Sequence, residues 1–322
     1  MHRDPFFKTL LSQGPRDIRG GLLLFTGVGA SVGSYSARIV RLDRAMRPCA
    51  AALFVAWITV GIAATGTAWA ATPCATVLEA GPTRTVARIV DGETVALDDG
   101  SELRLIGALA PRGFDVGSPP LAWPPEIATQ DALRALVLGK SMEIRFDGAR
   151  EDRHGRHLGQ AFVIDGVQRL WVQSHLLAHG LARAYATRGS RACAAELLAA
   201  EGAARQAGRG LWAQAAYQVR RAAETEDLIA YRNTFQLVEG TVASTAVVRG
   251  TVYLNFERKW RGAFSASLRR DDRGLLGAFS ANPKELEGRS VRVRGWIEQR
   301  GGGPAIDLSA AGPLEVLDQA SK

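Results

Sequence analysis

Residues 84–98 read RTVARIVDGETVALD. Apolar and polar residues alternate on both sides of the central Asp91-Gly92 pair, which is the pattern of strands that bury one face. An Asp-Gly pair between two such runs favours a tight turn, so we expect two antiparallel strands that meet there. The side chain of Asp91 is expected to bond nearby backbone, as turn aspartates do.

The residues that follow continue the pattern of short strands and add helices. The expected strands cover 102–109, 141–146 and 160–164. The expected helices cover 126–138, 170–179 and 192–207. Short strands with helices packed outside them are typical of a small closed barrel, and the five-stranded OB-type barrel is the obvious member of that class.

The pattern changes after residue 231. The expected strands there cover 235–244, 251–256, 263–268, 290–298 and 314–317. One short helical piece is expected near 274–286. These elements predict a second small OB-like β-barrel. The fold class is therefore mainly β with helices (α+β), with one barrel following the other.

The chain divides into five parts on these patterns. They are a mistranslated or disordered extension (1–45), a signal peptide (46–70), the first barrel (71–213), a charged, Ala-rich helical linker (214–230) and the second barrel (231–322). No short internal repeat is evident.

The signal peptide is predicted from three neighbouring features. Arg44 and Arg47 supply a positive start, 49–65 is almost free of charge, and Ala68-Trp69-Ala70 is a cleavage pattern. Met46 is well placed as the true start. We expect cleavage after Ala70 and a periplasmic or secreted protein. The alternative is a membrane anchor formed by 49–70, since a span needs roughly 20 apolar residues.

Cysteine usage fits an exported chain. Cleavage removes Cys49 and leaves Cys74 and Cys193 as an even pair, which makes them candidates for a disulfide. The alternative is two unpaired buried thiols.

The formal charge of +8 invites a nucleic-acid partner, but its distribution weakens that interpretation. Residues 1–70 carry +5, residues 71–215 are neutral and residues 216–322 carry +3. Most of the excess therefore lies in the segment expected to be removed. Strong phosphate binding depends on clustered cations, which total charge does not establish.

Five segments in order resemble the staphylococcal nuclease-like family. Residues 90–95 (VDGETV) resemble its I-D-G-D-T-V turn, 103–107 (LRLIG) its R-L-x-G strand, 152–156 (DRHGR) its D-x-x-G-R turn, 179–182 (HGLA) its G-L-A helix end, and 208–212 (GRGLW) its closing G-x-G-L-W. The resemblance covers 84–213 and implies an OB-type barrel.

The resemblance also implies a calcium-dependent nuclease mechanism. Calcium held by carboxylates binds the scissile phosphate, two arginines neutralise the developing charge, and a glutamate activates water. The arginines match Arg104 and Arg156, and the first calcium carboxylate matches Glu93, which is one methylene longer than the usual aspartate. The alternatives are a strand salt bridge for Arg104, a solvated turn charge for Arg156 and an exposed hairpin residue for Glu93.

Two further positions depart from the family pattern. The second calcium carboxylate is Leu109, which cannot ligate a hard cation, and the catalytic glutamate is Arg112, which cannot act as a base. An arginine there would attract phosphate and repel calcium. Asp115 is the candidate replacement carboxylate, and an ordinary loop charge is the alternative.

In the second expected barrel, aromatic residues and cations are interleaved along the sequence. Trp260 is flanked by Lys259 and Arg261, a combination with which OB barrels bind single strands. A single-stranded nucleic acid or a polysaccharide would fit such a groove. The alternative is that Tyr253 and Phe264 face the barrel core on alternating strands while the arginines are surface charge.

Three functions follow from these residues. The first is binding of nucleic acid or another phosphate-bearing anion without catalysis, through Arg104, Arg112, Arg156 and Trp260. The second is an active calcium-dependent phosphodiesterase that uses Glu93 and Asp115. The third is a structural or protein-interaction module of the cell envelope. No small-molecule cofactor is evident from the sequence, and calcium binding is doubtful.

Overall fold

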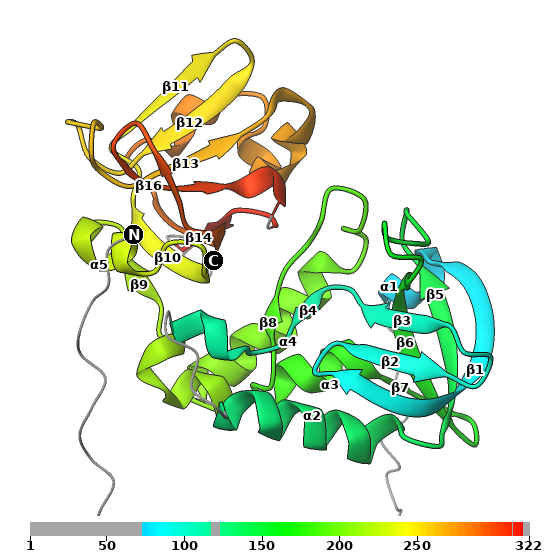
Figure 1. The fold of residues 1–322 in the computed structure, drawn as a ribbon. Coiled ribbons are helices and arrows are strands. Elements are labelled where there is room, and N and C mark those ends of the chain that lie inside the picture. Colours follow the sequence, from blue (N-terminus) through cyan, green and yellow to red (C-terminus); the bar gives the residue numbers. More distant parts are fainter. Residues whose placement is uncertain (1–72, 117–122, 311, 318–322) are drawn as a thin grey trace, which may run out of the picture. The chain divides into compact units, whose positions relative to one another are not determined.

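The structure is a computed structural model that describes residues 73–116, 123–310 and 312–317. The expected extension, the signal peptide and the alternative anchor lie outside the described residues. The fold is mixed α+β, with mostly strands and some helices (Figure 1). Among the described helices, none has the length and apolar character needed to cross a membrane.

The first barrel is a closed ring of strands. Its strands are β1 (Glu79–Asp91), β2 (Thr94–Leu97), β3 (Glu102–Leu105), β5 (Ser141–Phe146) and β6 (His157–Asp165), with β7 (Gln168–Trp171) beside β6. β1 pairs with β2 and β5, and β3 pairs with β2 and, in parallel, with β6. Because β5 also pairs with β6, the ring is complete. This is the expected OB-type barrel.

Alternating side chains fill this ring. Along β5, Met142, Ile144 and Phe146 are buried while their neighbours are more exposed. Leu103 and Leu105 of β3 are fully buried, so Arg104 between them faces outward. The alternation that predicted the strands therefore also places the candidate site residue on the outer face of the barrel.

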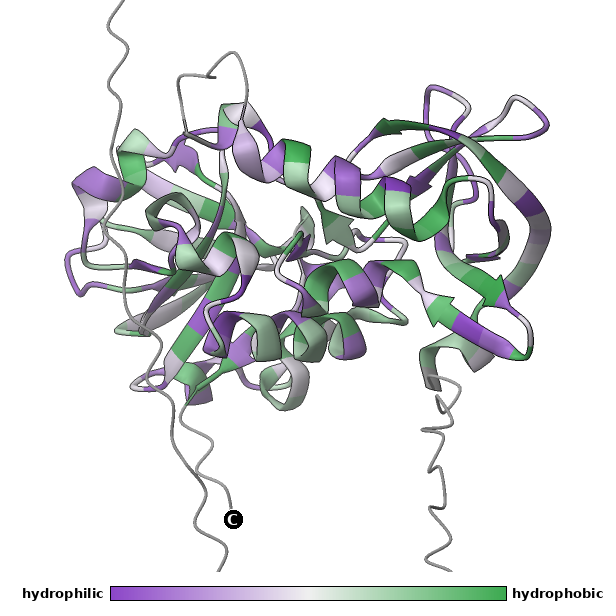
Figure 2. Cartoon of the chain, turned by 90° about the horizontal axis from the view of Figure 1, so that it is seen from below, coloured by the Kyte–Doolittle hydropathy of each residue, from purple (hydrophilic) through white to green (hydrophobic). Residues whose placement is uncertain are grey.

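Helices and short strands pack outside the ring. They are α1 (Pro73–Val77), β4 (Ala108–Leu109), η1 (Gly113–Val116), α2 (Pro124–Val137), α3 (Val172–Ala178), β8 (Arg183–Ala184), α4 (Ala194–Gln206) and η2 (Gly210–Ala213). In α2 the buried residues Pro125, Thr129, Leu133 and Val137 recur every four positions, as an amphipathic helix requires. Figure 2 shows polar and apolar residues interleaved along the helices and strands.

Two glycines of the quoted motifs meet in space. Gly180 and Gly210 both have positive φ, at 67° and 54°. A Cβ on Gly180 would come within 2.1 Å of the Arg209 carbonyl oxygen, and one on Gly210 within 2.3 Å of the Gly180 oxygen. The Leu211 N–H donates to that Gly180 oxygen at 2.8 Å. The H-G-L-A and G-R-G-L-W segments are therefore one packed corner that excludes side chains.

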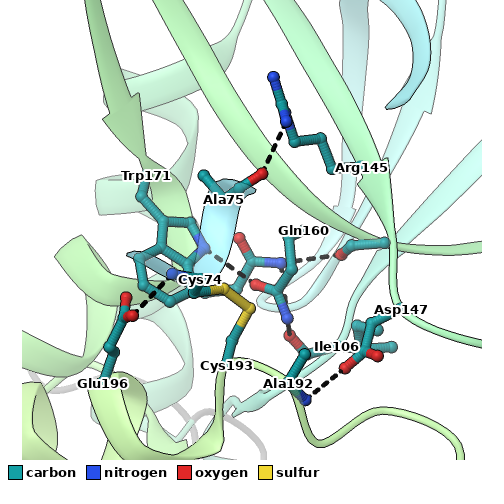
Figure 3. Close-up of a disulfide and its surroundings, with 12 residues drawn as sticks. Cys74, Ala75, Ile106, Arg145, Asp147, Gln160, Trp171, Ala192, Cys193 and Glu196 are labelled. Carbon is teal, nitrogen blue, oxygen red and sulfur yellow. Dashed lines mark hydrogen bonds between the residues drawn. A yellow bond between two sulfur atoms is a disulfide. The ribbon is translucent and has the colours of Figure 1, made fainter. Parts of the chain in front are cut away.

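Cys74 and Cys193 form a disulfide between α1 and the start of α4 (Figure 3). Their Cα atoms lie 5.0 Å apart and both side chains are buried. Hydrogen bonds hold the same region, because the Cys74 N–H donates to Glu196 at 2.7 Å and the Ala192 N–H to Asp147 at 2.9 Å. The bond ties the start of the described chain to a late helix.

Residues 214–230 differ from the expected helical linker. They contain η3 (Ala215–Tyr217), β9 (Arg220–Arg221) and α5 (Thr225–Ala230). β9 adds to β10 in parallel, and Tyr217 and Ala222 are buried. Tertiary contacts therefore outweigh the helical tendency of the alanines and charges here.

The C-terminal segment, residues 231–310 and 312–317, is also built mainly of strands. They are β10 (Phe235–Thr241), β11 (Ser244–Val248), β12 (Thr251–Asn255), β13 (Ser265–Leu268), β14 (Ser290–Trp296), β15 (Glu298–Arg300), β16 (Gly303–Asp307) and β17 (Glu315–Val316). The 3-10 helices η4 (Arg270–Phe279), η5 (Pro283–Leu286) and η6 (Leu308–Ala310) lie between them. The sheets run β17-β14-β10-β9 and β11-β12-β13-β16-β15.

Two features of this segment differ from the expected strands. Each of the two longest expected strands is divided, into β10 with β11 and into β14 with β15. The sequence does not predict β16, because Gly301–Pro304 has the composition of a turn. The apolar run that follows this turn is too short to indicate a strand. β16 forms because it pairs with β13 in parallel and β15 antiparallel, burying Ala305 and Ile306.

Buried polar contacts connect the first barrel to the C-terminal segment. Arg294 of β14 is fully buried and donates to Glu201 of α4 at 2.6 Å and to the Ala184 carbonyl at 2.8 Å. Arg188 and Arg191 both bind the buried Asp272, at 2.6 and 2.9 Å. Buried charges need such partners, and here each part of the chain supplies partners for the buried charges of the other.

Candidate functional site

Glu93 lies at the centre of the candidate site and is buried, with 1% of its surface exposed. Its N–H donates to Asp91 Oδ1 at 2.8 Å, which is the turn contact predicted for Asp91. Its Oε1 accepts from Arg104 at 2.9 Å and from Arg112, and its Oε2 accepts from the Ala110 N–H at 3.3 Å. Both carboxylate oxygens are therefore engaged by the protein.

The charges around Glu93 are strongly coupled. Burial raises the pKa of Glu93, and the nearby Arg104 and Arg112 oppose that shift. Burial also disfavours the charge on Arg104, but Glu93 and Tyr185 raise its pKa overall. Tyr185 is buried and bonds Arg104, and burial together with Glu93 raises the pKa of its hydroxyl. Glu93 and Tyr185 are therefore the buried members of a cluster whose arginines reach the surface.

The two arginines of the cluster differ in access to solvent. The Arg104 side chain is 26% exposed and the Arg112 side chain 44%. Within the described part of the chain, Glu93 is the ion-pair partner of Arg112, and nearly half of the Arg112 side chain remains exposed. A guanidinium carries five donors, which leaves Arg112 able to bind a second anion.

Leu109 is built into an apolar cluster. It is 8% exposed and packs in a cluster with the other buried residues Tyr185, Ala204, Trp212, Phe235 and Leu237. Phe235 and Leu237 belong to β10 of the C-terminal segment. The position at which the resemblance places a calcium carboxylate is therefore used for packing against another part of the chain.

Asp115, the candidate replacement carboxylate, is bound to other groups. Its Oδ2 accepts from the Arg112 N–H at 2.9 Å, from Arg183 at 2.7 Å and from the Tyr217 hydroxyl at 3.1 Å. Arg183 is itself buried and lies over the rings of Tyr217 and Phe235. Asp115 therefore anchors the turn in which it lies.

The residues present do not fit a calcium site. Calcium takes six to eight oxygen ligands. Here Glu93 is occupied by two guanidiniums and an amide, Leu109 has no oxygen, and Asp115 is held by Arg183. Within residues 73–116, 123–310 and 312–317, no group of three or more His, Cys, Asp or Glu side chains could hold a metal ion.

Arg156, the second arginine of the resemblance, lies in the turn before β6. It binds Asp152 at 2.7 Å, and the Asp152 carboxylate also accepts from the Arg156 N–H at 3.1 Å. These hydrogen bonds lower the pKa of Asp152 to about 2 although partial burial opposes the shift. β3 pairs with β6 so that Arg104 lies opposite Leu158. Arg156 therefore lies two residues before Leu158, in the turn that leads into β6.

A comparison with protein families identifies the first barrel. Residues 102–214 match the family described as Staphylococcal nuclease homologue. The chain carries a staphylococcal nuclease-like domain. The match includes Arg104, Leu109, Arg112 and Arg156, while Glu93 lies in the preceding hairpin of the same barrel. No curated protein matches the chain significantly.

Sequence reasoning missed several residues that shape the nuclease-like domain's site. Arg183 binds Asp115 and the Phe235 carbonyl, Tyr185 bonds Arg104, and Tyr217 bonds Asp115. One signal for Arg183 was present, because an arginine stands alone among small apolar residues at 181–186. A buried cation needs a buried partner, and Asp115 was the nearest unexplained acid in the site.

Trp260, the candidate of the C-terminal segment, lies in the loop between β12 and β13. It is 50% exposed, and the Arg261 guanidinium lies 5.5 Å from its ring centre. Phe264 is buried in the core cluster of this segment, as the alternative expects, whereas Tyr253 is only half-buried. Some aromatic residues of this segment therefore fill its core, as one sequence alternative expects. Trp260 faces solvent, as the nucleic-acid-binding alternative expects.

Proposed function

We propose that the nuclease-like domain binds the phosphodiester backbone of a nucleic acid without metal and without cleaving it. The observation that carries this proposal is the pairing of Arg112 with Glu93. An arginine stands where the resemblance places the catalytic glutamate, and it occupies the carboxylate that the resemblance assigns to calcium.

The chemistry of the cluster supports binding more than catalysis. A general base must be within reach of water and able to accept a proton. Glu93 is buried beneath two guanidiniums, and Arg112 stays protonated. Phosphate oxygens, in contrast, are suitable acceptors for the outward N–H groups of Arg112.

The C-terminal segment is proposed to be a second OB-like barrel that extends the binding surface. The order β11-β12-β13-β16-β15 and the pairing of β10 with β14 support this, because β10 leads into β11 and β14 into β15. The pairing of β13 with β16 is parallel, like that of β3 with β6 in the first barrel. Trp260, beside Arg261, is the proposed stacking residue of this surface.

Export is a further part of the proposal. The expected signal peptide motivates it, and the disulfide between Cys74 and Cys193 supports it, because disulfides persist in oxidising compartments. Fractionation of cells that express a C-terminally tagged chain tests this. Recovery of the tagged chain from the cytosol, with both thiols reduced, would contradict export.

The binding proposal is tested with a fluorescent single-stranded oligonucleotide, by anisotropy across a salt series with calcium or with chelator. We expect salt-sensitive binding that does not depend on calcium, no shortening of the oligonucleotide, and weaker binding for Arg112→Gln. A Lys140→Gln variant, which removes a charge elsewhere on the barrel, is the control.

Two results would overturn this function. Calcium-dependent cleavage that Arg104→Ala abolishes would establish the active phosphodiesterase instead. Absence of salt-sensitive binding would favour the structural or protein-interaction module, since phosphate contacts always weaken as salt rises.

A further inference from the structure

An exposed aromatic ring lies two residues from Arg112. Phe114 belongs to the short helix η1 and is 72% exposed. Single exposed apolar residues are common on protein surfaces and need no explanation by themselves. Phe114 differs because hydrogen bonds hold the residues on both sides of it, and one of them, Asp115, is bound to the buried Arg183.

The backbone of the turn is held first by its own contacts. The Asp115 N–H donates to the Arg112 carbonyl at 2.9 Å, and the Arg112 N–H donates to the Asp115 carboxylate at 2.9 Å. The Gly113 N–H donates to Glu126 in the first turn of α2 at 3.2 Å. The residues on both sides of Phe114 are therefore bonded.

The Asp115 carboxylate then anchors the turn in the interior. Arg183, which binds it at 2.7 Å, has a side chain only 3% exposed and also donates to the Phe235 carbonyl at 2.6 Å. Tyr217 donates to the same carboxylate. The backbone that carries the exposed Phe114 ring is thus held in place, so little backbone freedom remains to be lost when a ligand binds.

A cation and a second ring belong to the same network. The Arg112 side chain is 44% exposed. Trp123, which is partly buried, donates from its indole N–H to the Tyr217 hydroxyl at 2.8 Å. An exposed ring and a partly exposed guanidinium on one short turn can together bind an unpaired base and its phosphate.

We propose that Phe114 is a stacking platform for an unpaired nucleobase and makes the site selective for single-stranded nucleic acid. This inference rests on the proposed function, because Arg112 is to hold the phosphate while Phe114 holds the base. A duplex would be bound more weakly at this site, since its bases are already stacked on one another.

The test compares three ligands of equal length: oligo-dT, an abasic deoxyribose-phosphate oligomer and a duplex. We expect Phe114→Ala to weaken oligo-dT binding about tenfold, because stacking on one ring contributes on this scale. The same change should leave binding of the abasic oligomer within about twofold. Arg112→Gln should weaken both single-stranded ligands. Val167→Ala, at a site 95% exposed between β6 and β7, is the matched apolar control.

A second variant keeps the inference falsifiable. Phe114→Trp should retain oligo-dT affinity, and oligo-dT should change its tryptophan emission, relative to the wild type, more than the abasic oligomer does. The inference is overturned if Phe114→Ala binds oligo-dT like the wild type while Arg112→Gln weakens binding. It is also overturned if Phe114→Ala mainly lowers the melting temperature, as expected for a ring that packs against protein. If neither single-stranded ligand binds the wild-type protein, the proposed function itself is wrong.

Discussion

Arg112 and Glu93, nineteen residues apart in the sequence, form an ion pair at the centre of the nuclease-like site. The resemblance places acids at both positions, where they would repel each other unless a cation lay between them. A guanidinium at one position turns this repulsion into attraction within the protein itself. Leu109 removes a further negative charge, so the group is stabilised without any added cation.

Glu93→Gln should strengthen binding of a single-stranded oligonucleotide. Glutamine keeps the shape and an acceptor oxygen, but it leaves the positive charges of Arg104 and Arg112 uncompensated. We expect about fivefold tighter binding at low salt and a salt slope steeper by roughly 0.7, the change for one more phosphate contact on a single strand. Anisotropy titrations from low to high salt measure both quantities.

The contrasting variant is Arg112→Gln, which should shift the affinity and the salt slope in the opposite direction. Equal salt slopes for Glu93→Gln, Arg112→Gln and the wild type would show that this cluster does not contact phosphate.

Leu109→Asp should destabilise the protein and should not create a calcium-dependent nuclease. The new carboxylate would lie among Tyr185, Trp212 and Phe235, and its cross-strand neighbour Arg183 already pairs with Asp115. We expect a loss of about 4 kcal/mol in the free energy of unfolding, the scale of a large core substitution. Denaturant unfolding measures this loss, and Leu109→Ala separates the lost volume from the added charge.

The same expectation holds when Leu109→Asp is combined with Arg112→Glu. Calcium-dependent cleavage by that double variant would mean that the site still admits a metal, contrary to the burial of Leu109.

Local patterns in the sequence predicted most of the first barrel. Turn residues predict the hairpin turn at Asp91, alternation predicts the strand β5, and helical spacing predicts the helix α2. Each of these patterns lies within a single short segment of the sequence. The five quoted segments follow the order of the barrel's elements, so they predicted Arg104 on a strand and Arg156 in an exposed turn.

The contacts of the site could not be predicted in the same way. The sequence predicts that Glu93 is an exposed hairpin residue or a calcium ligand. In the structure it is buried beneath Arg104 of β3 and Arg112, which follows β4. For Leu109 the sequence indicates only that a calcium ligand is absent. Its packing partners Phe235 and Leu237 lie more than a hundred residues away, so the sequence around Leu109 does not indicate them. Such long-range packing leaves no periodic signal in a single sequence.

The disulfide between Cys74 and Cys193 should contribute strongly to stability. The two cysteines are 119 residues apart, so their bond restricts a long loop of the unfolded chain. Removing it should cost about 4 kcal/mol on the chain-entropy scale. Urea unfolding of the oxidised protein with and without reductant measures this cost. A Cys74→Ser, Cys193→Ser double variant should resemble the reduced protein and should not respond to reductant.

Asp272 should make the protein acid-sensitive. Arg188 and Arg191 bind its buried carboxylate, and although burial opposes the shift, these hydrogen bonds lower its pKa. Because the folded state then binds the proton less readily than the unfolded state, stability is full above the ordinary value of about 4 and falls as the pH decreases towards the folded pKa. Asp272→Asn should lose about 3 kcal/mol at pH 7, as expected when one partner of a buried ion pair is removed.

The variant should also depend less on pH than the wild type between about pH 4 and pH 2. Thermal unfolding at several pH values in this window and at pH 7 compares the two proteins. Asp271→Asn, which removes the neighbouring charge in η4, is the matched control and should follow the wild type. If Asp272→Asn and the wild type lose stability in parallel as the pH falls, other carboxylates control the acid response. The ion pairs of Arg188 and Arg191 would then contribute little to joining the nuclease-like domain to the C-terminal segment.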